Sequence, residues 1–160
     1  MLIKSDLAKA YDRISWAYLL QILEAFIFST KWIALIESLI SMTFFSIFIN
    51  VSPSSTFIPS RGIRQGDPLS PFLLILSMEG LWRMYKNSCL LGHILGLHLL
   101  GQDLPVTHQQ FVDNVLLFGP PTTKEVEGLR RILQSFMEAL GTIINTNKTN
   151  ILFFNCEEVI

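Results

Sequence analysis

Apolar residues recur at three- and four-residue intervals in four stretches of the chain, as they do on the buried face of a helix. These stretches predict helices over residues 16–26, 30–42 and 69–89, and from residue 122 or 123 to about 140. A serine stands directly before each of the first two helices, where its hydroxyl can cap free backbone N–H groups. The run 72–76 is apolar on every face, so we expect the third helix to be buried all round.

Shorter stretches rich in β-branched and aromatic residues predict strands around these helices. The expected strands are Met1–Asp6, a hairpin of 43–51 and 57–58 across the turn residues 52–55, short strands within 93–110 around Gly101-Gln102-Asp103, a tight hairpin with Asp113-Asn114 at its tip, and 151–154. Helices and strands alternate along the chain, and two of the connections are hairpins. The predicted fold class is therefore α+β, with a small antiparallel sheet packed on helices.

Composition narrows the possible classes of protein. The chain has 160 residues, of which 50% are hydrophobic and 16% charged, with a net charge of −1. This length suits one domain, and such hydrophobicity excludes intrinsic disorder. Because the chain has 12 basic and 13 acidic residues, it lacks the excess of positive charge that a strong nucleic-acid binder usually carries. Within the charge-free stretch 38–60 only residues 39–51 are convincingly apolar, which is short for a membrane span.

Three polar features stand where an apolar chain has least structural reason to place them: the segment Asp6–Asp12, the loop Ser60–Pro71 and the pair Asp113-Asn114. A carboxylate at a strand end and another at a hairpin tip can lie side by side in one sheet and bind Mg²⁺. A basic, glycine-containing loop offers N–H groups and guanidinium groups to phosphate. Taken singly, Asp12 could cap the following helix, and the Asp-Asn pair could be an ordinary turn.

Together these features resemble the palm of reverse transcriptases from non-LTR (LINE-type) retroelements, most like those of plants. Asp6–Asp12 matches the family's Asp followed by Leu-x-Lys-Ala-Tyr-Asp, and Arg61–Pro71 matches Arg-Gly-Leu-Arg-Gln-Gly-Asp-Pro-Leu-Ser-Pro with Ile63 as the one change. Phe111–Asn114 matches Phe-Ala-Asp-Asp. Further matches are Gly141, Ile144-Asn145 and Lys148-Thr149. The resemblance covers roughly residues 1–155, as a partial palm domain, and leaves 156–160 as a tail.

The resemblance implies a role for each matched residue. Asp6 and Asp113 would bind the Mg²⁺ or Mn²⁺ ions of a two-metal nucleotidyl-transfer site. The residues for nucleotide and template would be Tyr11, Arg61, Arg64, Gln65, Gly66 and Lys148. Among these, Tyr11 would favour deoxynucleotides by crowding the sugar 2′-position, and Lys148 would approach the pyrophosphate. The implied partners are an RNA template, a DNA primer and a deoxynucleoside triphosphate, in the cytoplasm or nucleus.

Several positions depart from the family pattern. Asn114 replaces an aspartate, which removes one negative charge from the metal site. Gln109-Gln110 stand where the family has two apolar residues, one of which should face the core, and Ile27 and Val51 stand where it has turn glycines, so a positive φ there would be strained. We expect these changes to impair catalysis.

The resemblance also predicts that the fingers upstream and the thumb downstream are absent, so we expect the chain by itself to lack polymerase activity. Two alternatives stay open. One is a non-catalytic interaction domain that keeps the palm fold and uses exposed apolar surface. The weaker one is a small membrane-associated protein built around residues 39–51.

Overall fold

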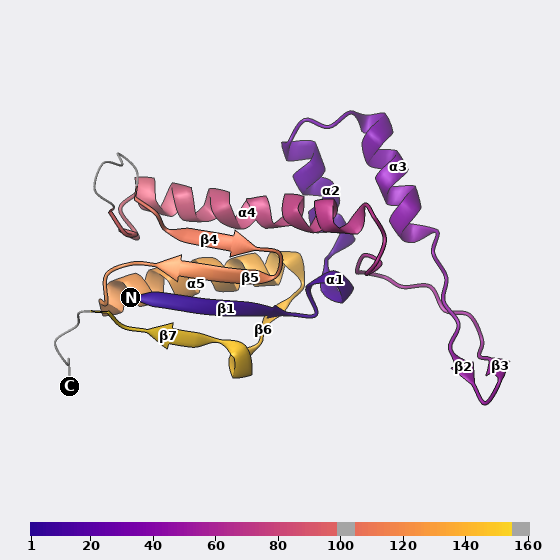
Figure 1. The fold of residues 1–160 in the computed structure, drawn as a ribbon. Coiled ribbons are helices and arrows are strands. Elements are labelled where there is room, and N and C mark those ends of the chain that lie inside the picture. Colours follow the sequence, from indigo (N-terminus) through magenta and orange to yellow (C-terminus); the bar gives the residue numbers. More distant parts are fainter. Residues whose placement is uncertain (99–104, 155–160) are drawn as a thin grey trace.

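The computed structural model describes residues 1–98 and 105–154 (Figure 1). An antiparallel sheet with the strand order β4-β5-β1-β6 forms its centre, and β7 also pairs with β1. The strands are β1 Leu2–Ala8, β4 His108–Phe111, β5 Asn114–Phe118, β6 Ile143–Ile144 and β7 Asn150–Leu152. The helices are α1 Ala10–Arg13, α2 Trp16–Ala25, α3 Thr30–Ser41, α4 Ser70–Leu90 and α5 Thr123–Leu140, with a 3-10 turn, η1, at Thr146–Lys148. The α+β prediction is confirmed.

Strand β1 organises the sheet because it pairs with three other strands. Leu2 lies opposite Phe118 of β5 and also opposite Leu152 of β7, while Leu7 lies opposite Ile144 of β6. The strand continues two residues beyond the predicted end at Asp6. Alternate residues of β1 and β5 point into one core shared with α4 and α5, as the period of two in a strand requires.

The predicted helix starts are confirmed by their caps. The hydroxyl of Ser15 accepts a hydrogen bond from the N–H of Tyr18, that of Ser29 from Trp32, and that of Thr122 from Glu125. Each hydroxyl satisfies one of the backbone donors that the first turn leaves free. Since Ser15 caps α2, the alternative in which Asp12 performs this role is wrong.

The expectation that α4 is buried on every face is wrong. Leu74, Met78 and Leu81 are fully buried against the sheet and the other helices, but Phe72 is 64% exposed and Ile75 48% exposed. Within the described residues no element lies over the outer face of α4 at these positions. An apolar run shows what a helix can bury, whereas the neighbouring elements decide what it does bury.

Residues 43–60 form a projecting hairpin that we call the apolar arm (Figure 1). It carries the short strands β2 Phe48–Ile49 and β3 Ser52–Pro53 and a bridge between Phe45 and Phe57. The reversal lies at Asn50-Val51, not at the predicted turn 52–55, because both residues adopt the positive φ (48° and 68°) of a two-residue hairpin loop. The exposed large apolar side chains of the arm are Phe44, Phe45, Ile47, Phe48, Ile49, Val51, Phe57 and Ile58.

The structure also bears on the glutamines of the edge strand and on membrane-spanning helices, whereas one predicted turn and the tail lie outside the residues it describes. On the edge strand β4, Gln109 is exposed, whereas Gln110 is half-buried and lies opposite the fully buried Val115, so the expectation that one of the two faces the core is confirmed. The predicted turn Gly101-Gln102-Asp103 and the tail 156–160 lie outside the described residues, although the flanks of that turn pair at Leu97 and Val106. None of the helices formed by residues 1–98 and 105–154 is long and apolar enough to cross a membrane.

Candidate functional site

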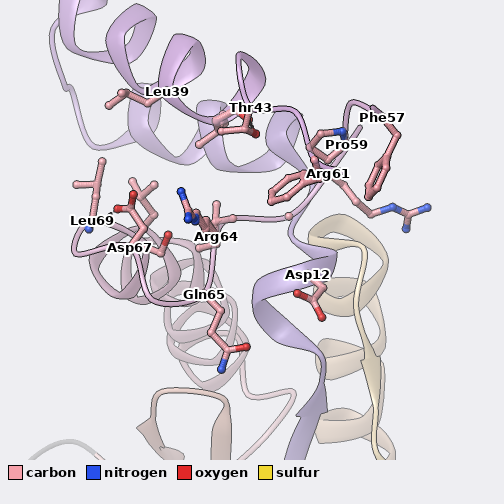
Figure 2. A pocket seen from close by; sticks show the side chains of 16 residues that line it. Asp12, Leu39, Thr43, Phe57, Pro59, Arg61, Arg64, Gln65, Asp67 and Leu69 are labelled. Atoms are coloured by element: carbon pink, nitrogen blue, oxygen red, sulfur yellow. Dashed lines mark hydrogen bonds between the residues drawn. The ribbon is translucent and has the colours of Figure 1, made fainter. Parts of the chain in front are cut away.

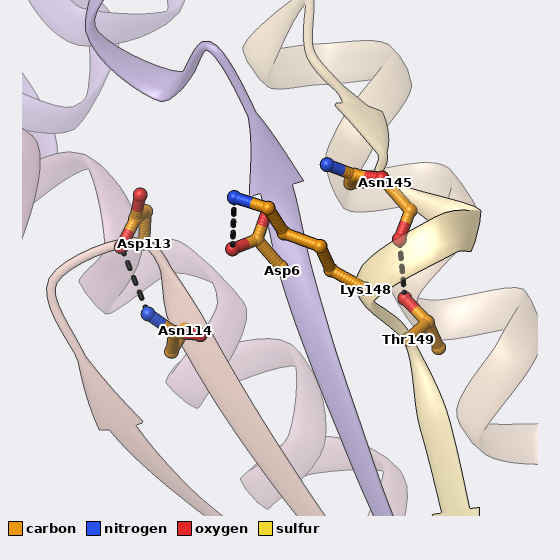
Figure 3. Close-up of polar contacts among 6 residues, drawn as sticks. All are labelled: Asp6, Asp113, Asn114, Asn145, Lys148 and Thr149. Carbon is orange, nitrogen blue, oxygen red and sulfur yellow. Dashed lines mark hydrogen bonds and ion pairs between the residues drawn. The ribbon is translucent and has the colours of Figure 1, made fainter.

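The sheet brings Asp6 and Asp113 to one end of two neighbouring strands. Asp6 of β1 lies opposite Asn114 of β5, and the N–H of Leu7 donates to the carbonyl oxygen of Asp113 at 3.0 Å. Figure 3 shows both carboxylates at the same end of the sheet. Asp6 is nearly buried, at 9% exposed for the residue as a whole, although its side chain ends in a carboxylate. Such a carboxylate needs a positive partner.

The hairpin between β4 and β5 positions Asp113. Phe111 pairs with Asn114, which leaves Val112 and Asp113 as a two-residue loop. Val112 has a positive φ of 54° and Asp113 does not, which is the pattern of a type II′ turn, where glycine is usual at the first position. A β-branched residue is strained in this region. The turn carries the side chain of Asp113 at the tip of the hairpin, beside β1.

Each carboxylate already has a partner from the same chain (Figure 3). The ammonium Nζ of Lys148 lies 3.8 Å from Oδ2 of Asp6. The amide Nδ2 of Asn114 donates to Oδ1 of Asp113 at 3.0 Å, so Asn114 holds by a hydrogen bond a group that a second aspartate would repel. The amide oxygen of Asn114 remains free to act as a neutral ligand.

The donor set suits a hard divalent cation. Asp6 and Asp113 supply carboxylate oxygens and Asn114 an amide oxygen, which are the groups that Mg²⁺ accepts, usually one or two at a time together with water. No group of three or more His, Cys, Asp or Glu side chains that could hold a metal exists among residues 1–98 and 105–154. The residues present therefore fit an ion shared with substrate phosphates better than a closed structural metal site.

The start of the basic loop is fixed to the segment that follows β1. The N–H of Gly62 donates to the carbonyl of Ile14 at 2.8 Å, and the indole N–H of Trp16 donates to the carbonyl of Gly62 at 2.6 Å. Gly62 has a φ of 87°, and a Cβ atom on it would lie 2.6 Å from the carbonyl oxygen of Asp12. Glycine is therefore required here both by conformation and by space.

A cleft of about 650 Å³ opens between this loop, the apolar arm and the end of α3 (Figure 2). Arg61, Arg64 and Gln65 line it, together with Asp12 and Asp67. The carboxylate of Asp67 accepts a hydrogen bond from the N–H of Leu69 at 2.8 Å and so closes the turn before α4. Arg64 sets one guanidinium group beside the apolar walls of the cleft, a combination suited to a phosphate-bearing ligand with a planar base, whereas Figure 2 shows the guanidinium of Arg61 pointing away from the cleft.

The structure groups the predicted site residues in two places. Asp6, Asp113, Asn114 and Lys148 form one cluster, and Arg61, Arg64 and Gln65 line the cleft. Tyr11 and Gly66 do not line that cleft. The backbone carbonyl of Tyr11 accepts a hydrogen bond from the N–H of Ile63. Gly66 adopts a positive φ of 92° in the basic loop.

Sequence reasoning missed two contributors to the site. One is Trp16, which fixes the basic loop through its indole N–H. The other is Asn145, whose backbone N–H donates to the carbonyl of Asp6 at 2.8 Å. Both contacts join segments far apart in the chain; the family match includes Asn145 but gives it no role, and nothing in the local sequence signals the contact of Trp16.

A family profile described as "Reverse transcriptase (RNA-dependent DNA polymerase)" matches residues 1–158. The chain belongs to the reverse transcriptase family. It is 27% identical over 145 residues to the Transposon TX1 uncharacterized 149 kDa protein of Xenopus laevis, covering 91% of this chain and 11% of that protein. It is 27% identical over 143 residues to the Retrovirus-related Pol polyprotein from type-2 retrotransposable element R2DM of Drosophila melanogaster, covering 89% of this chain and 13% of that protein.

These reverse transcriptase relatives confirm the resemblance to non-LTR retroelements. The plant-like character is supported by an uncharacterized mitochondrial protein of Arabidopsis thaliana, 38% identical over 72 residues, which are 44% of this chain and 59% of that protein. The chain thus spans only a small part of the two transposon proteins it matches over most of its length.

Solved structures show the same reverse transcriptase fold. Telomerase from Candida albicans, determined in complex with the TWJ fragment of telomeric RNA, matches with a TM-score of 0.71 at 18% identity, over 96% of this chain and 28% of that one. Apo telomerase from Candida tropicalis, truncated from its C-terminal domain, also gives 0.71, at 17% identity over 98% of this chain and 31% of that one. The prediction of a polymerase palm-like fold is confirmed.

Proposed function

We propose that the chain carries the palm of an RNA-directed DNA polymerase in which Asp6 and Asp113 bind divalent metal ions. The observation that carries the proposal is the register of β1 and β5, which sets two carboxylates side by side at one end of the sheet. Mg²⁺ or Mn²⁺ bound there would polarise the attacking primer hydroxyl and stabilise the leaving pyrophosphate.

The chain's own residues would position the nucleic acid and the nucleotide. Arg61 and Arg64, from the loop that lines the cleft, would attract phosphates of an RNA template or an incoming deoxynucleoside triphosphate through their guanidinium groups. Gln65 can accept and donate hydrogen bonds to a base edge. Tyr11, on α1, and Lys148, at the end of η1, complete the set that we assign to the sugar and the phosphates.

We further propose that the chemistry is impaired. Asn114 gives the site one negative charge fewer to hold two divalent ions, and its amide bonds to the remaining hairpin carboxylate. A primer-extension assay on an RNA template with Mg²⁺ or Mn²⁺ tests this statement. We expect no incorporation, and template-dependent extension of the primer would contradict it.

The metal site itself is tested separately by titration with Mn²⁺. An ion present at 100 times its dissociation constant stabilises the folded state by about 2.7 kcal/mol, which shifts the melting temperature by several degrees in a domain of this size. We expect that shift in the unchanged chain and its loss in Asp6→Asn and Asp113→Asn. Glu127→Gln, an exposed carboxylate on α5, is the matched control and should keep it. A shift that survives both aspartate substitutions would place the metal elsewhere.

A second candidate function is a non-catalytic interaction domain, which the apolar arm favours. Its run of exposed aromatic and aliphatic side chains is larger than the scattered apolar residues of an ordinary surface. The same Mn²⁺ titration separates the two functions. An interaction domain that has kept only the fold shows no stabilisation by metal that depends on Asp6 and Asp113.

A further inference from the structure

The two candidate metal-binding carboxylates are each held by a different kind of partner. Asp113 receives a neutral amide donor from Asn114, the next residue along the hairpin. Asp6 receives the ammonium of Lys148, which comes from η1 between β6 and β7. One partner is therefore uncharged and local, and the other is charged and distant in sequence.

We propose that Lys148 is a counter-cation that competes with a divalent metal ion for Asp6, and thereby sets the metal affinity of the site. This inference rests on the proposed function and adds a regulation of the same site. It assigns Lys148 a role in the metal-free state, before any nucleotide is bound.

The backbone places Lys148 beside Asp6 independently of its charge. The N–H of Asn145 donates to the carbonyl of Asp6 at 2.8 Å, and the N–H of Lys148 donates to the carbonyl of Asn145 at 3.1 Å. The hydroxyl of Thr149 donates to the same carbonyl of Asn145 at 2.9 Å. The turn that carries Lys148 is thus fixed to β1, and only the side chain has to move when another cation arrives (Figure 3).

The side chain of Lys148 is free to make that movement. It is 68% exposed, whereas the side chain of Asp6 is 13% exposed, so the ammonium approaches a nearly buried carboxylate from the solvent side. A divalent ion would approach Asp6 from the same open side. An ammonium and a metal ion at one carboxylate repel each other, so metal binding at Asp6 favours the departure of Lys148.

Asn114 differs in this respect. Its Nδ2 holds Asp113 by a hydrogen bond, and its oxygen stays available, so the amide can remain in place when a metal binds. Competition is therefore expected at Asp6 and not at Asp113. Asn114 and Lys148 together hold the two carboxylates in position without metal, but of these two only Lys148 opposes the binding of a metal ion.

The test is the dissociation constant for Mn²⁺, measured from the electron paramagnetic resonance signal of free Mn²⁺ in titrations of the whole chain. Loss of an ion pair whose ammonium is exposed to solvent corresponds to roughly a fivefold change in the affinity for a competing cation. At low ionic strength we expect Lys148→Met to bind Mn²⁺ about fivefold more tightly than the unchanged chain, because the competing ammonium has been removed. Lys148→Arg keeps the charge and should bind like the unchanged chain, and Lys124→Met, which removes an exposed lysine from α5, should change nothing.

The outcomes separate this inference from the proposed function. If Asp113→Asn abolishes Mn²⁺ binding but Lys148→Met leaves the affinity unchanged or weakens it, the metal site stands and the competition is refuted. If Lys148→Met binds more tightly and Asp113→Asn removes that binding, both are supported. If neither the unchanged chain nor Lys148→Met binds Mn²⁺ at millimolar concentration, both are refuted.

Discussion

Ile27 ends α2 in a conformation that suits glycine, and its replacement by glycine should stabilise the protein. The N–H of Phe28 donates to the carbonyl of Leu23 at 3.1 Å, and that of Ile27 to Glu24 at 2.9 Å. These two bonds define the Schellman motif, in which the residue after the cap is left-handed and is usually glycine. Ile27 has the required φ of 61° although it is β-branched.

Helix α4 ends in the same motif with the usual residue. The N–H of His93 donates to the carbonyl of Ser88 at 2.9 Å, and that of Gly92 to Cys89 at 3.0 Å. Gly92 has a φ of 70°, and a Cβ atom on it would have no neighbour within 4 Å. Gly92→Ala therefore measures the conformational strain alone, without a steric clash, and is the matched control for Ile27→Gly.

The expected size follows from two opposing terms. A left-handed φ costs an L-residue about 1–2 kcal/mol. Glycine also gives the unfolded chain more conformational freedom, which lowers the free energy of unfolding by about 0.4–1 kcal/mol and so offsets part of that gain. The side chain of Ile27 is 91% exposed, so its removal loses little buried area. The net expectation is a free energy of unfolding raised by about 0.5–1 kcal/mol in Ile27→Gly and lowered by about 1 kcal/mol in Gly92→Ala.

Urea unfolding followed by circular dichroism measures both changes as shifts of the midpoint at constant slope. Ile27→Ala is the second control, and it should give little gain because alanine keeps the Cβ atom that is strained. If Ile27→Gly is neutral or less stable while Gly92→Ala is destabilised as expected, then Ile27 is not strained, and the reasoning from φ is refuted.

Two further predictions concern groups around the core. Burial raises the pKa of Tyr18 to about 12, and its hydroxyl donates to the carbonyl of Ser77 at 2.9 Å. The folded pKa lies above the unfolded value near 10, so this contribution to stability is complete below about pH 10 and is lost as the pH rises toward 12. Unfolding free energies measured between pH 9 and 12 should fall less steeply in Tyr18→Phe, and an equal slope would contradict the assignment. Gly62→Ala combines a left-handed φ with a Cβ 2.6 Å from the carbonyl of Asp12, so it should lower the free energy of unfolding by more than about 2 kcal/mol, and a loss under 1 kcal/mol would show that the loop yields easily.

Helix positions were predictable because their signals are local. Ser15 and Ser29 cap the helices that follow them, and hydroxyl, N–H and apolar stripe lie within a few residues of one another. The turn of the apolar arm was misplaced for the opposite reason. Ser52 and Pro53 look like turn residues, but the reversal uses Asn50 and Val51 at a φ that valine rarely adopts, so composition pointed two residues too far along the chain.

The candidate site was predictable only in part. A carboxylate near a strand end and another at a hairpin tip suggested that Asp6 and Asp113 meet, and the register of β1 and β5 brings them together. The ion pair of Lys148 with Asp6 depends on a turn that the β6 and β7 pairings place beside β1. Such a contact is set by the whole sheet, and side-chain chemistry alone does not predict it.

The pairing of β1 also orders the events of folding. The amino group of Met1 bonds to the carbonyl of Gly119 across 118 positions in the chain, so β1 leaves the ribosome well before any of its sheet partners has been made. Contacts of such high contact order form slowly and leave apolar strand faces open to aggregation or to chaperones in the meantime. Because Asp6 meets Asp113 and Lys148 only after β5, β6 and β7 have joined β1, the candidate metal site is expected to be among the last parts of the protein to assemble.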